Sequence, residues 1–131
     1  MATIAARKIV EGGLAASLST AATGGDEFTN TGIEFIRIQN SHASVAYTVR
    51  ITAQTTSIKH PTYGTVNKSN TDVTVAASGG EAYIGPFVQG SWNDTNNKVQ
   101  VSYRTTGTYA TGSAIGTGSH LLKLEILYLE N

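Results

Sequence analysis

The chain of 131 residues contains no cysteine, and it has only two prolines and one tryptophan. The absence of cysteine excludes disulfide bonds, thiolate metal sites and a cysteine nucleophile. The formal net charge is zero, with nine basic and nine acidic residues. Because nucleic-acid binding depends on lysine and arginine side chains that neutralise phosphates, we expect no nucleic-acid partner.

Charged residues are also scarce, at 14% of the chain, which is below the usual quarter. Threonine, serine, asparagine and glycine must cover much of the surface. That surface suits a subunit that packs against neighbours, and it is equally typical of β proteins in general. No apolar run approaches the roughly 20 residues that cross a bilayer, so we expect no membrane partner. The N-terminal sequence MATIAARKIVEGG also lacks the apolar stretch of a signal peptide.

Alternation of apolar and polar residues predicts a chain built of β-strands. The last predicted strand carries leucines on both faces, so we expect part of it to be covered on both sides. Glycine- and asparagine-rich turns separate the strands. This pattern predicts an all-β fold, a single-domain antiparallel β-sandwich or jelly-roll-like barrel. The predicted strands are residues 33–39, 45–53, 71–75, 81–84, 98–104 and 121–129.

The two ends of the chain and its long connectors are expected to differ from this sandwich. Residues 1–24 have few large apolar side chains, and we interpret them as an arm that is ordered only when something else holds it. A weak helical pattern at 5–18 is interrupted by glycines. The sandwich domain is expected over residues 25–131. Long connectors at 54–70 and 105–120 have the length of functional or disordered loops.

No set of residues points to a catalytic or metal site. His42, His60 and His120 lie in three different loop regions without metal-ligand spacing. Neither a serine nucleophile elbow nor a phosphate-binding loop is present. We therefore expect no enzyme activity, no cofactor and no metal.

The stretch at 92–97 combines the single tryptophan with a cluster of asparagine and aspartate. Asp94 and Asn96 resemble the start of a calcium loop, but Lys98 occupies its next ligand position. We expect a tight turn here, because asparagine and aspartate tolerate the backbone that such turns need. Phe87 and Trp92 would then fill the core or an interface. A glycan-binding surface is the alternative, since aromatic rings with amide and carboxylate groups suit sugars.

Several motifs occur together in a fixed order. They are G-D-E-F-x-N-x-G-x-E-F-I-R-I-x-N (25–40), V-x-Y-T-V-R-I (45–51), V-T-V-A-A-S-G-G-E (73–81), I-G-P-F (84–87), W-N-D (92–94) and V-Q-V-S-Y (99–103). Over residues 24–103 the chain resembles a family of small all-β proteins encoded among the virion genes of tailed bacteriophages. The loop at 54–70 and the insertion at 105–119 depart from that family.

The resemblance implies a structural virion protein, with a capsid decoration (cement) protein as the first expectation. A head–tail connector or tail component is the second. The glycan-binding alternative, as a module for host adsorption, rests on Trp92 and its polar neighbours and not on the resemblance. The expected partners are the major capsid protein or other virion proteins and further copies of the chain, such as a trimer. The expected location is the virion, assembled in the host cytoplasm. The predicted contact residues are Ile4, Arg7, Ile9, Phe87, Trp92, Asn93, Asp94, Tyr109 and Ile115.

Overall fold

The computed structural model describes residues 2–22, 24–55, 57–105 and 122–129. Strands dominate these residues, and the one helix among them is only four residues long. In chain order the elements are β1 (Ala2–Thr3), β2 (Ala6–Ile9), β3 (Ser19–Thr20), β4 (Asp26–Thr29), β5 (Phe35–Asn40), β6 (Tyr47–Ile51), β7 (Ser57–His60), β8 (Gly64–Asn67), β9 (Thr71–Val75), β10 (Gly80–Ile84), α1 (Gln89–Trp92), β11 (Lys98–Arg104) and β12 (Leu122–Leu129).

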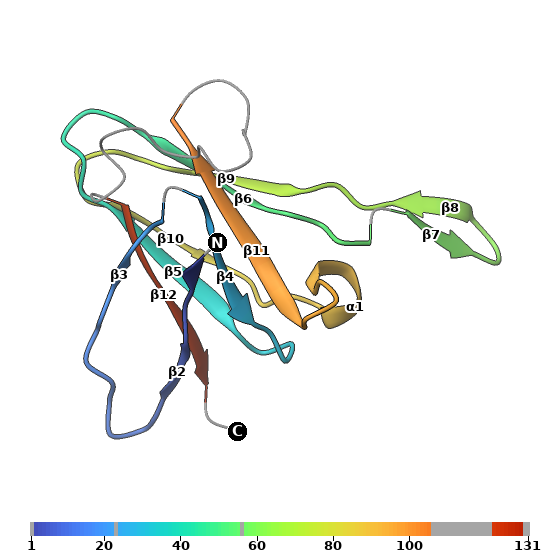
Figure 1. Cartoon of the computed structure of the whole chain (residues 1–131), viewed down its shortest axis with the longest axis horizontal. Helices are drawn as coiled ribbons and strands as arrows, with labels where there is room; N and C mark the ends of the chain where they lie inside the picture. The colour runs from blue at the N-terminus through green and yellow to red at the C-terminus, as the bar shows by residue number, and fades with distance from the viewer. Residues whose placement is uncertain (1, 23, 56, 106–121, 130–131) are drawn as a thin grey trace.

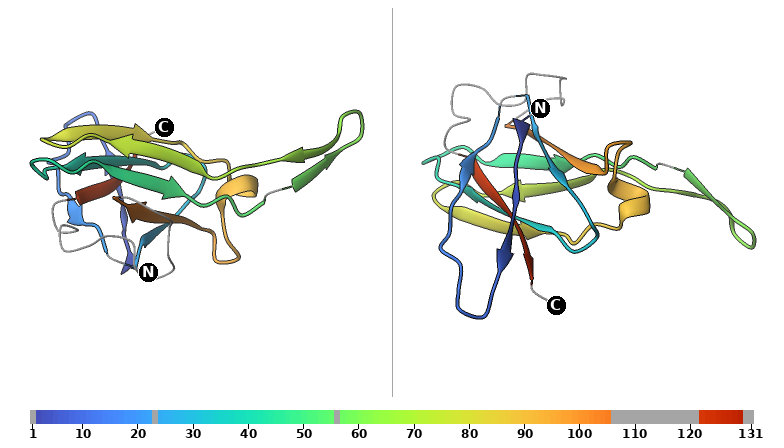
Figure 2. Two further views of the ribbon diagram at one scale, coloured as in Figure 1. Left: turned by 90° about the horizontal axis from the view of Figure 1, so that it is seen from above. Right: turned by 60° about the horizontal axis from the view of Figure 1, so that its bottom comes forward.

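Two five-stranded sheets pack face to face as a sandwich (Figures 1 and 2). The first, here called the β11 sheet, has the strand order β1-β4-β11-β6-β9. The second, the β12 sheet, has the order β10-β5-β12-β2, and β3 also pairs with β12. β7 and β8 form a separate hairpin that projects from the sandwich at the end where α1 lies (Figure 1).

Eight strands give the sandwich the connectivity of a jelly roll. They are β3, β4, β5, β6, β9, β10, β11 and β12, and every pairing among them is antiparallel. The chain passes from one sheet to the other at every step except from β6 to β9. The prediction of an all-β, single-domain sandwich of jelly-roll type is therefore confirmed.

The N-terminal segment departs from the predicted arm and from a wholly antiparallel sandwich. β1 lies parallel to β4, whereas β2 lies parallel to β12, so both sheets are mixed. Residues 2–20 thus add strands to both sheets, and the interrupted helical pattern at 5–18 forms no helix but contains β2. Composition could not indicate this, because edge pairing uses backbone N–H and C=O groups and needs no large apolar side chains.

The core lies between the two sheets, where the alternation predicted it. β12 is buried on both faces over part of its length, as predicted, since Glu125 and Leu127 are 3% and 6% exposed. Burying a large apolar side chain stabilises the fold by about 1.5–3 kcal/mol, so these strands hold the sandwich together. The largest fully buried side chains are Phe28, Ile36, Ile38, Tyr47, Val49, Ile51, Val75, Val99, Tyr103, Leu122, Leu124 and Ile126.

The strands of five or more residues were predicted, and the strands of two to four residues were missed. The strands at 71–75 and 98–104 have the predicted bounds, and the other predicted strands agree within a few residues. The connector predicted at 54–70 contains the β7–β8 hairpin, and β4 and α1 were not predicted. Gly85 lies at a close backbone approach, because an added Cβ would be 3.1 Å from Phe35 Cα.

Candidate functional site

The outer face of the β12 sheet is the most distinctive surface of the described chain. Strand register arranges its outward side chains in rows across β12, β5 and β10. The first row is polar, the second joins an ion pair to a tyrosine, and the third is apolar. From β12 to β10 the rows are Lys123–Gln39–Glu81, then Glu125–Arg37–Tyr83, then Leu127–Phe35.

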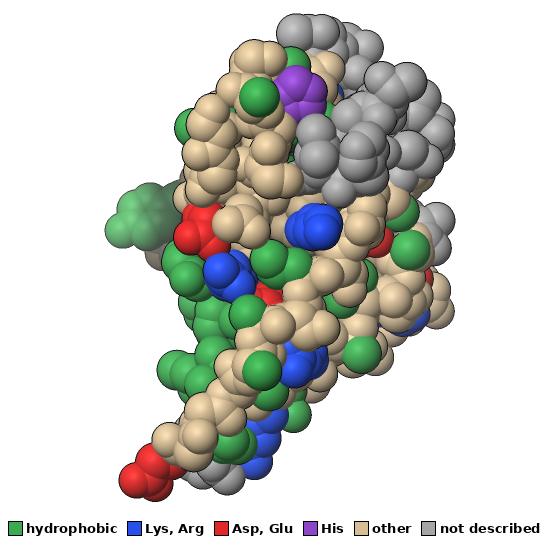
Figure 3. Space-filling view, turned by 90° about the vertical axis from the view of Figure 1, so that its left-hand side faces the viewer, with side chains coloured by type: hydrophobic (Ala, Val, Ile, Leu, Met, Phe, Trp, Pro, Cys, Tyr) green, Lys and Arg blue, Asp and Glu red, His purple; other side chains and the backbone are tan. Residues whose placement is uncertain are grey.

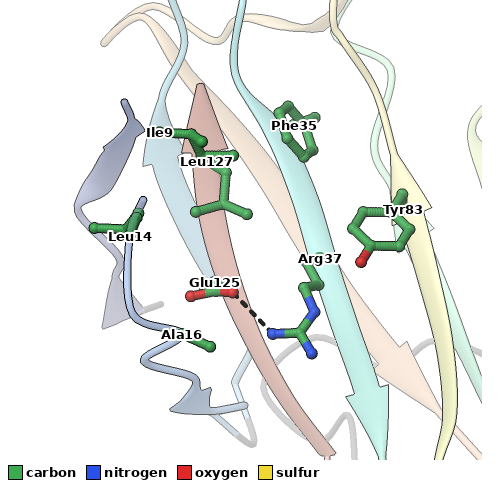
Figure 4. A pocket seen from close by; sticks show the side chains of 8 residues that line it. All are labelled: Ile9, Leu14, Ala16, Phe35, Arg37, Tyr83, Glu125 and Leu127. Atoms are coloured by element: carbon green, nitrogen blue, oxygen red, sulfur yellow. Dashed lines mark hydrogen bonds and ion pairs between the residues drawn. The ribbon is translucent and has the colours of Figure 1, made fainter. Parts of the chain in front are cut away.

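A hollow of about 370 Å³ opens on this face. Its floor comes from β5, β10 and β12, whereas β2 and the β2–β3 loop form one wall (Figure 4). The rings of Phe35 and Tyr83 lie side by side, with centroids 6.5 Å apart. We call this feature the outer hollow; it is lined by Ile9, Leu14, Ala16, Phe35, Arg37, Tyr83, Glu125 and Leu127.

The Glu125 carboxylate organises the floor of the outer hollow. Its Oε1 accepts a hydrogen bond from Arg37 Nη1 at 3.0 Å (Figure 4). Its Oε2 accepts the Ser17 backbone N–H at 3.0 Å and an Arg7 Nη1 bond at 3.4 Å. Since the side chain is only 4% exposed, these bonds replace the water it loses. One carboxylate therefore ties β2, the β2–β3 loop and β5 to β12.

The charges around the outer hollow neutralise one another. Arg37 also donates to Glu81 Oε1 at 2.7 Å, so it bridges two carboxylates. The hydrogen bonds to Glu125 and Glu81 raise the pKa of Arg37, which keeps it charged at every accessible pH. Two arginines thus face two carboxylates, and the site has no surplus charge with which to attract an ionic substrate.

Beyond the third row the outer face becomes apolar and exposed. Two further hollows adjoin it, one lined by Ile9, Val10, Glu11 and Leu129, and the other by Gly32, Ile33, Phe35, Pro86 and Leu129. Side chains of hydrophobic type gather on this side of the molecule (Figure 3). We call this region the apolar end, and its most exposed members are Val10 (38%), Ile33 (42%) and Leu129 (59%). Clustered exposed side chains of this kind mark contact surfaces.

The predicted cluster at 92–94 forms a structural corner. Trp92 is only 6% exposed, and its ring packs edge-on against Phe87 with centroids 6.0 Å apart. Two hydrogen bonds join Asn93 to the buried Asn30: Asn30 Nδ2 donates to Asn93 Oδ1, and Asn93 Nδ2 donates to the Asn30 backbone carbonyl. The aromatic face that suggested glycan binding is therefore inside the protein.

Asp94 closes the tight turn that the sequence predicted. Its Oδ1 accepts the backbone N–H groups of Asn96 and Lys98, and its Oδ2 accepts the Gln100 amide. Asn97 has the positive φ of 61° that such turns require. Burial alone would raise the pKa of Asp94, but these hydrogen bonds outweigh it and lower the pKa. A carboxylate with both oxygens engaged has a structural role here.

The remaining predicted contact residues are distributed as follows. Ile4 packs against the core, whereas Arg7 and Ile9 lie on β2, at the outer hollow. Tyr109 and Ile115 lie outside the described residues. The structure thus brings Arg7 and Ile9 together with residues that sequence reasoning missed, chiefly Glu125.

One buried polar pair elsewhere could have been catalytic. The Tyr103 hydroxyl donates to Asp26 Oδ2 at 2.6 Å, and the Ala22 backbone N–H donates to the same oxygen at 3.0 Å. Burial raises the pKa of Asp26 despite these bonds, and it raises the pKa of Tyr103 well above its ordinary value. Because the two side chains are 2% and 0% exposed, no substrate reaches them. The pair links β4 to β11.

The described residues contain no group of three or more potential metal ligands, and no helix among them is long and apolar enough to cross a membrane. His42 stabilises the turn in which it lies, since its Nδ1 accepts the Ser44 and Val45 backbone N–H groups.

Comparisons with family models, curated proteins and solved structures found no match for this chain. The function must therefore be argued from the outer face itself.

Proposed function

We propose that this chain is a non-enzymatic structural protein of a tailed-bacteriophage virion, and specifically a capsid decoration protein. In this role it binds the assembled head shell through the outer face of the β12 sheet. The motifs between residues 24 and 103 support the virion assignment. The exposed apolar end supports the assignment as a docking protein.

The apolar end is the single observation that carries the proposal. Ile33 and Leu129 are 42% and 59% exposed, so water contacts large apolar side chains at neighbouring positions. Covering such a side chain contributes about 1–2 kcal/mol to binding. The adjacent ion pairs neutralise one another, so a partner covers this face without leaving an unpaired charge.

Shell stabilisation follows from mass action in this proposal. A protein that binds the assembled shell, and not its free subunits, shifts the equilibrium toward the shell. Each contact can be weak, because many copies act on one particle. A sandwich with a fixed docking face is sufficient for this role, and no reaction chemistry is required.

The test is co-sedimentation of the purified protein with phage heads that lack it. We expect the wild type to pellet with the heads. Leu129→Asp should weaken binding by about tenfold or more, because it places a charge in the apolar contact. Thr95→Asp is the matched control, since Thr95 is exposed in the Asp94 turn and should leave binding unchanged.

Two results would contradict the proposal. Wild-type protein that stays in the supernatant is not a decoration protein, and equal binding of Leu129→Asp removes the apolar end from the contact. Cryo-electron microscopy of the particle distinguishes the second candidate. Density at the neck or tail, and none on the shell, would assign the chain to a head–tail connector or tail component.

A further inference from the structure

The β7–β8 hairpin projects from the sandwich as an arm with a fixed base (Figure 2). The Gln54 and Thr55 backbone N–H groups donate to the Ser91 carbonyl at 2.9 and 3.2 Å. Thr55 Oγ1 also donates to the Gly90 carbonyl at 2.8 Å. These bonds fasten the base to α1, so the fold sets the direction in which the arm points. Beyond the base, the two strands of the arm extend away from both sheets (Figures 1 and 2).

The two strands of the arm have only each other as partners. In the described chain, β7 and β8 form a two-stranded sheet that no further strand extends. Each strand therefore has one edge whose outward backbone N–H and C=O groups pair with no other described strand. A lone two-stranded hairpin is marginally stable in water, and a sheet of three or more strands is more stable. A strand added at one edge would therefore stabilise the arm.

The absence of charge distinguishes β8 from the other edge strands of the described chain. Proteins protect exposed edges with charged side chains or by keeping the edge strand very short. Of the described edge strands, β1 and β3 have only two residues, and every longer one except β8 contains a charged residue. These charged residues are Arg7 and Lys8 on β2, Lys59 on β7, Asp72 on β9 and Glu81 on β10. The sequence of β8, G-T-V-N, has neither a charge nor a proline, so its edge lacks the usual protection.

A second β8 strand suits this edge. Two identical strands can pair antiparallel about a two-fold axis, which is the commonest symmetry of homo-oligomers. Pairing through β8 brings no like charges together, whereas pairing through β7 would bring Lys59 near its own copy. Antiparallel pairing also leaves the two sandwiches at opposite ends of the joined arms, so they do not collide (Figure 2). Both copies gain stability, because each hairpin becomes half of a four-stranded sheet.

We propose that β8 of one copy pairs antiparallel with β8 of a second copy, so that the two arms form a four-stranded sheet in the order β7-β8-β8-β7. The contact is isologous, so it produces a closed dimer. The ladder is short, because β8 has four residues, and the dimer is therefore weak between copies free in solution. Copies held on one surface have a high effective concentration, which favours the same contact. The inference goes beyond shell binding and does not depend on it.

Disulfide trapping tests the contact directly, because the chain has no cysteine of its own. Thr65→Cys places a thiol on β8, and Ser57→Cys, the matched control, places one on the same face of β7. Both positions are exposed, so both variants should fold as the wild type does. Under mild oxidation without phage heads, we expect Thr65→Cys to form a covalent dimer at least about ten times faster than Ser57→Cys, since only β8 lies beside its own copy. Equal rates would overturn the proposal.

Amide hydrogen exchange, measured up to millimolar protein concentration, tests the backbone pairing itself. We expect exchange in β8 to slow as the concentration rises, because its outward N–H groups gain partners. Thr65→Lys places two lysines close together in the dimer and should raise the concentration required by about two- to fivefold. Ser57→Lys adds the same charge to β7 and should have a smaller effect.

Two results would exclude the contact between β8 strands. One is exchange in β8 that does not change with concentration, and the other is an equal effect of Thr65→Lys and Ser57→Lys. Head binding is measured separately, so failure here leaves the decoration role standing, and the reverse also holds.

Discussion

Replacing Glu125 by glutamine tests whether one carboxylate holds the N-terminal segment on the sandwich. The substitution keeps the shape of the side chain and removes its charge. Glutamine can accept at one oxygen only, so its amide group must face either Arg37 or the donors Ser17 and Arg7. A buried donor then meets another donor, and two arginines lose a shared counter-charge.

The expected cost follows from the exposure of the partners. Removing one member of a fully buried ion pair costs about 3–5 kcal/mol. Here the side chains of Arg37 and Arg7 are 21% and 32% exposed, and Arg37 keeps its bond to Glu81. We therefore expect a smaller loss of about 2–3 kcal/mol in the free energy of unfolding. For a chain of this size that lowers Tm by roughly 6–15 °C.

Urea denaturation and hydrogen exchange provide the assay. Glu81→Gln is the matched control, because it removes the other carboxylate of Arg37 from a more exposed site and should cost under about 1 kcal/mol. In Glu125→Gln, amide exchange should rise most in residues 2–20, while β11 and β6 stay protected. Equal costs for the two variants, or uniform exchange across both sheets, would refute the anchoring role of Glu125.

Three further predictions concern the core and the titrating groups. Trp92→Ala should lower the free energy of unfolding by about 3–5 kcal/mol in urea melts, because the buried ring fills the core. Because the ring is buried, this variant and the wild type should give the same result on a glycan array. Burial raises the pKa of Asp26 above 3.8, so its contribution to stability falls as pH rises past that value. Asp26→Asn should therefore gain stability relative to wild type as pH rises from 3.8 toward neutrality, which pH-dependent melts can follow. The hydrogen bond from Arg50 lowers the pKa of Asp72, so Asp72→Asn should cost under about 1 kcal/mol at pH 7, and this difference should vanish as pH falls below 3.8.

The sandwich could be predicted because its core strands carry long, regular alternation. In β11, for example, Val99, Val101 and Tyr103 face the core and are fully buried. The turn at Asp94 was predictable for a similar reason, since local backbone chemistry decides it. Pairing partners were not predictable, because period-two alternation fixes which face a side chain takes and not which strand lies beside it.

The candidate site escaped prediction because its residues are far apart in the chain. Glu125 bonds Arg7, Ser17 and Arg37, which precede it by 118, 108 and 88 positions. A signal was present in the apolar residues on both faces of the last strand, which indicated that something covers it. Which residues cover the last strand could not be inferred, because that depends on strand register. The register places Leu127 beside Phe35 and Glu125 beside Arg37.

The N-terminal segment links the stability of the fold to the proposed docking face. Three lining residues of the outer hollow, Ile9, Leu14 and Ala16, come from this segment, and Glu125 fastens it through Arg7 and Ser17. Releasing the segment would remove one wall of the hollow and leave the eight jelly-roll strands nearly complete. Glu125→Gln should therefore weaken co-sedimentation with phage heads under conditions where the sandwich remains folded. Undiminished head binding, combined with faster exchange in residues 2–20, would show that the proposed docking face does not depend on that wall.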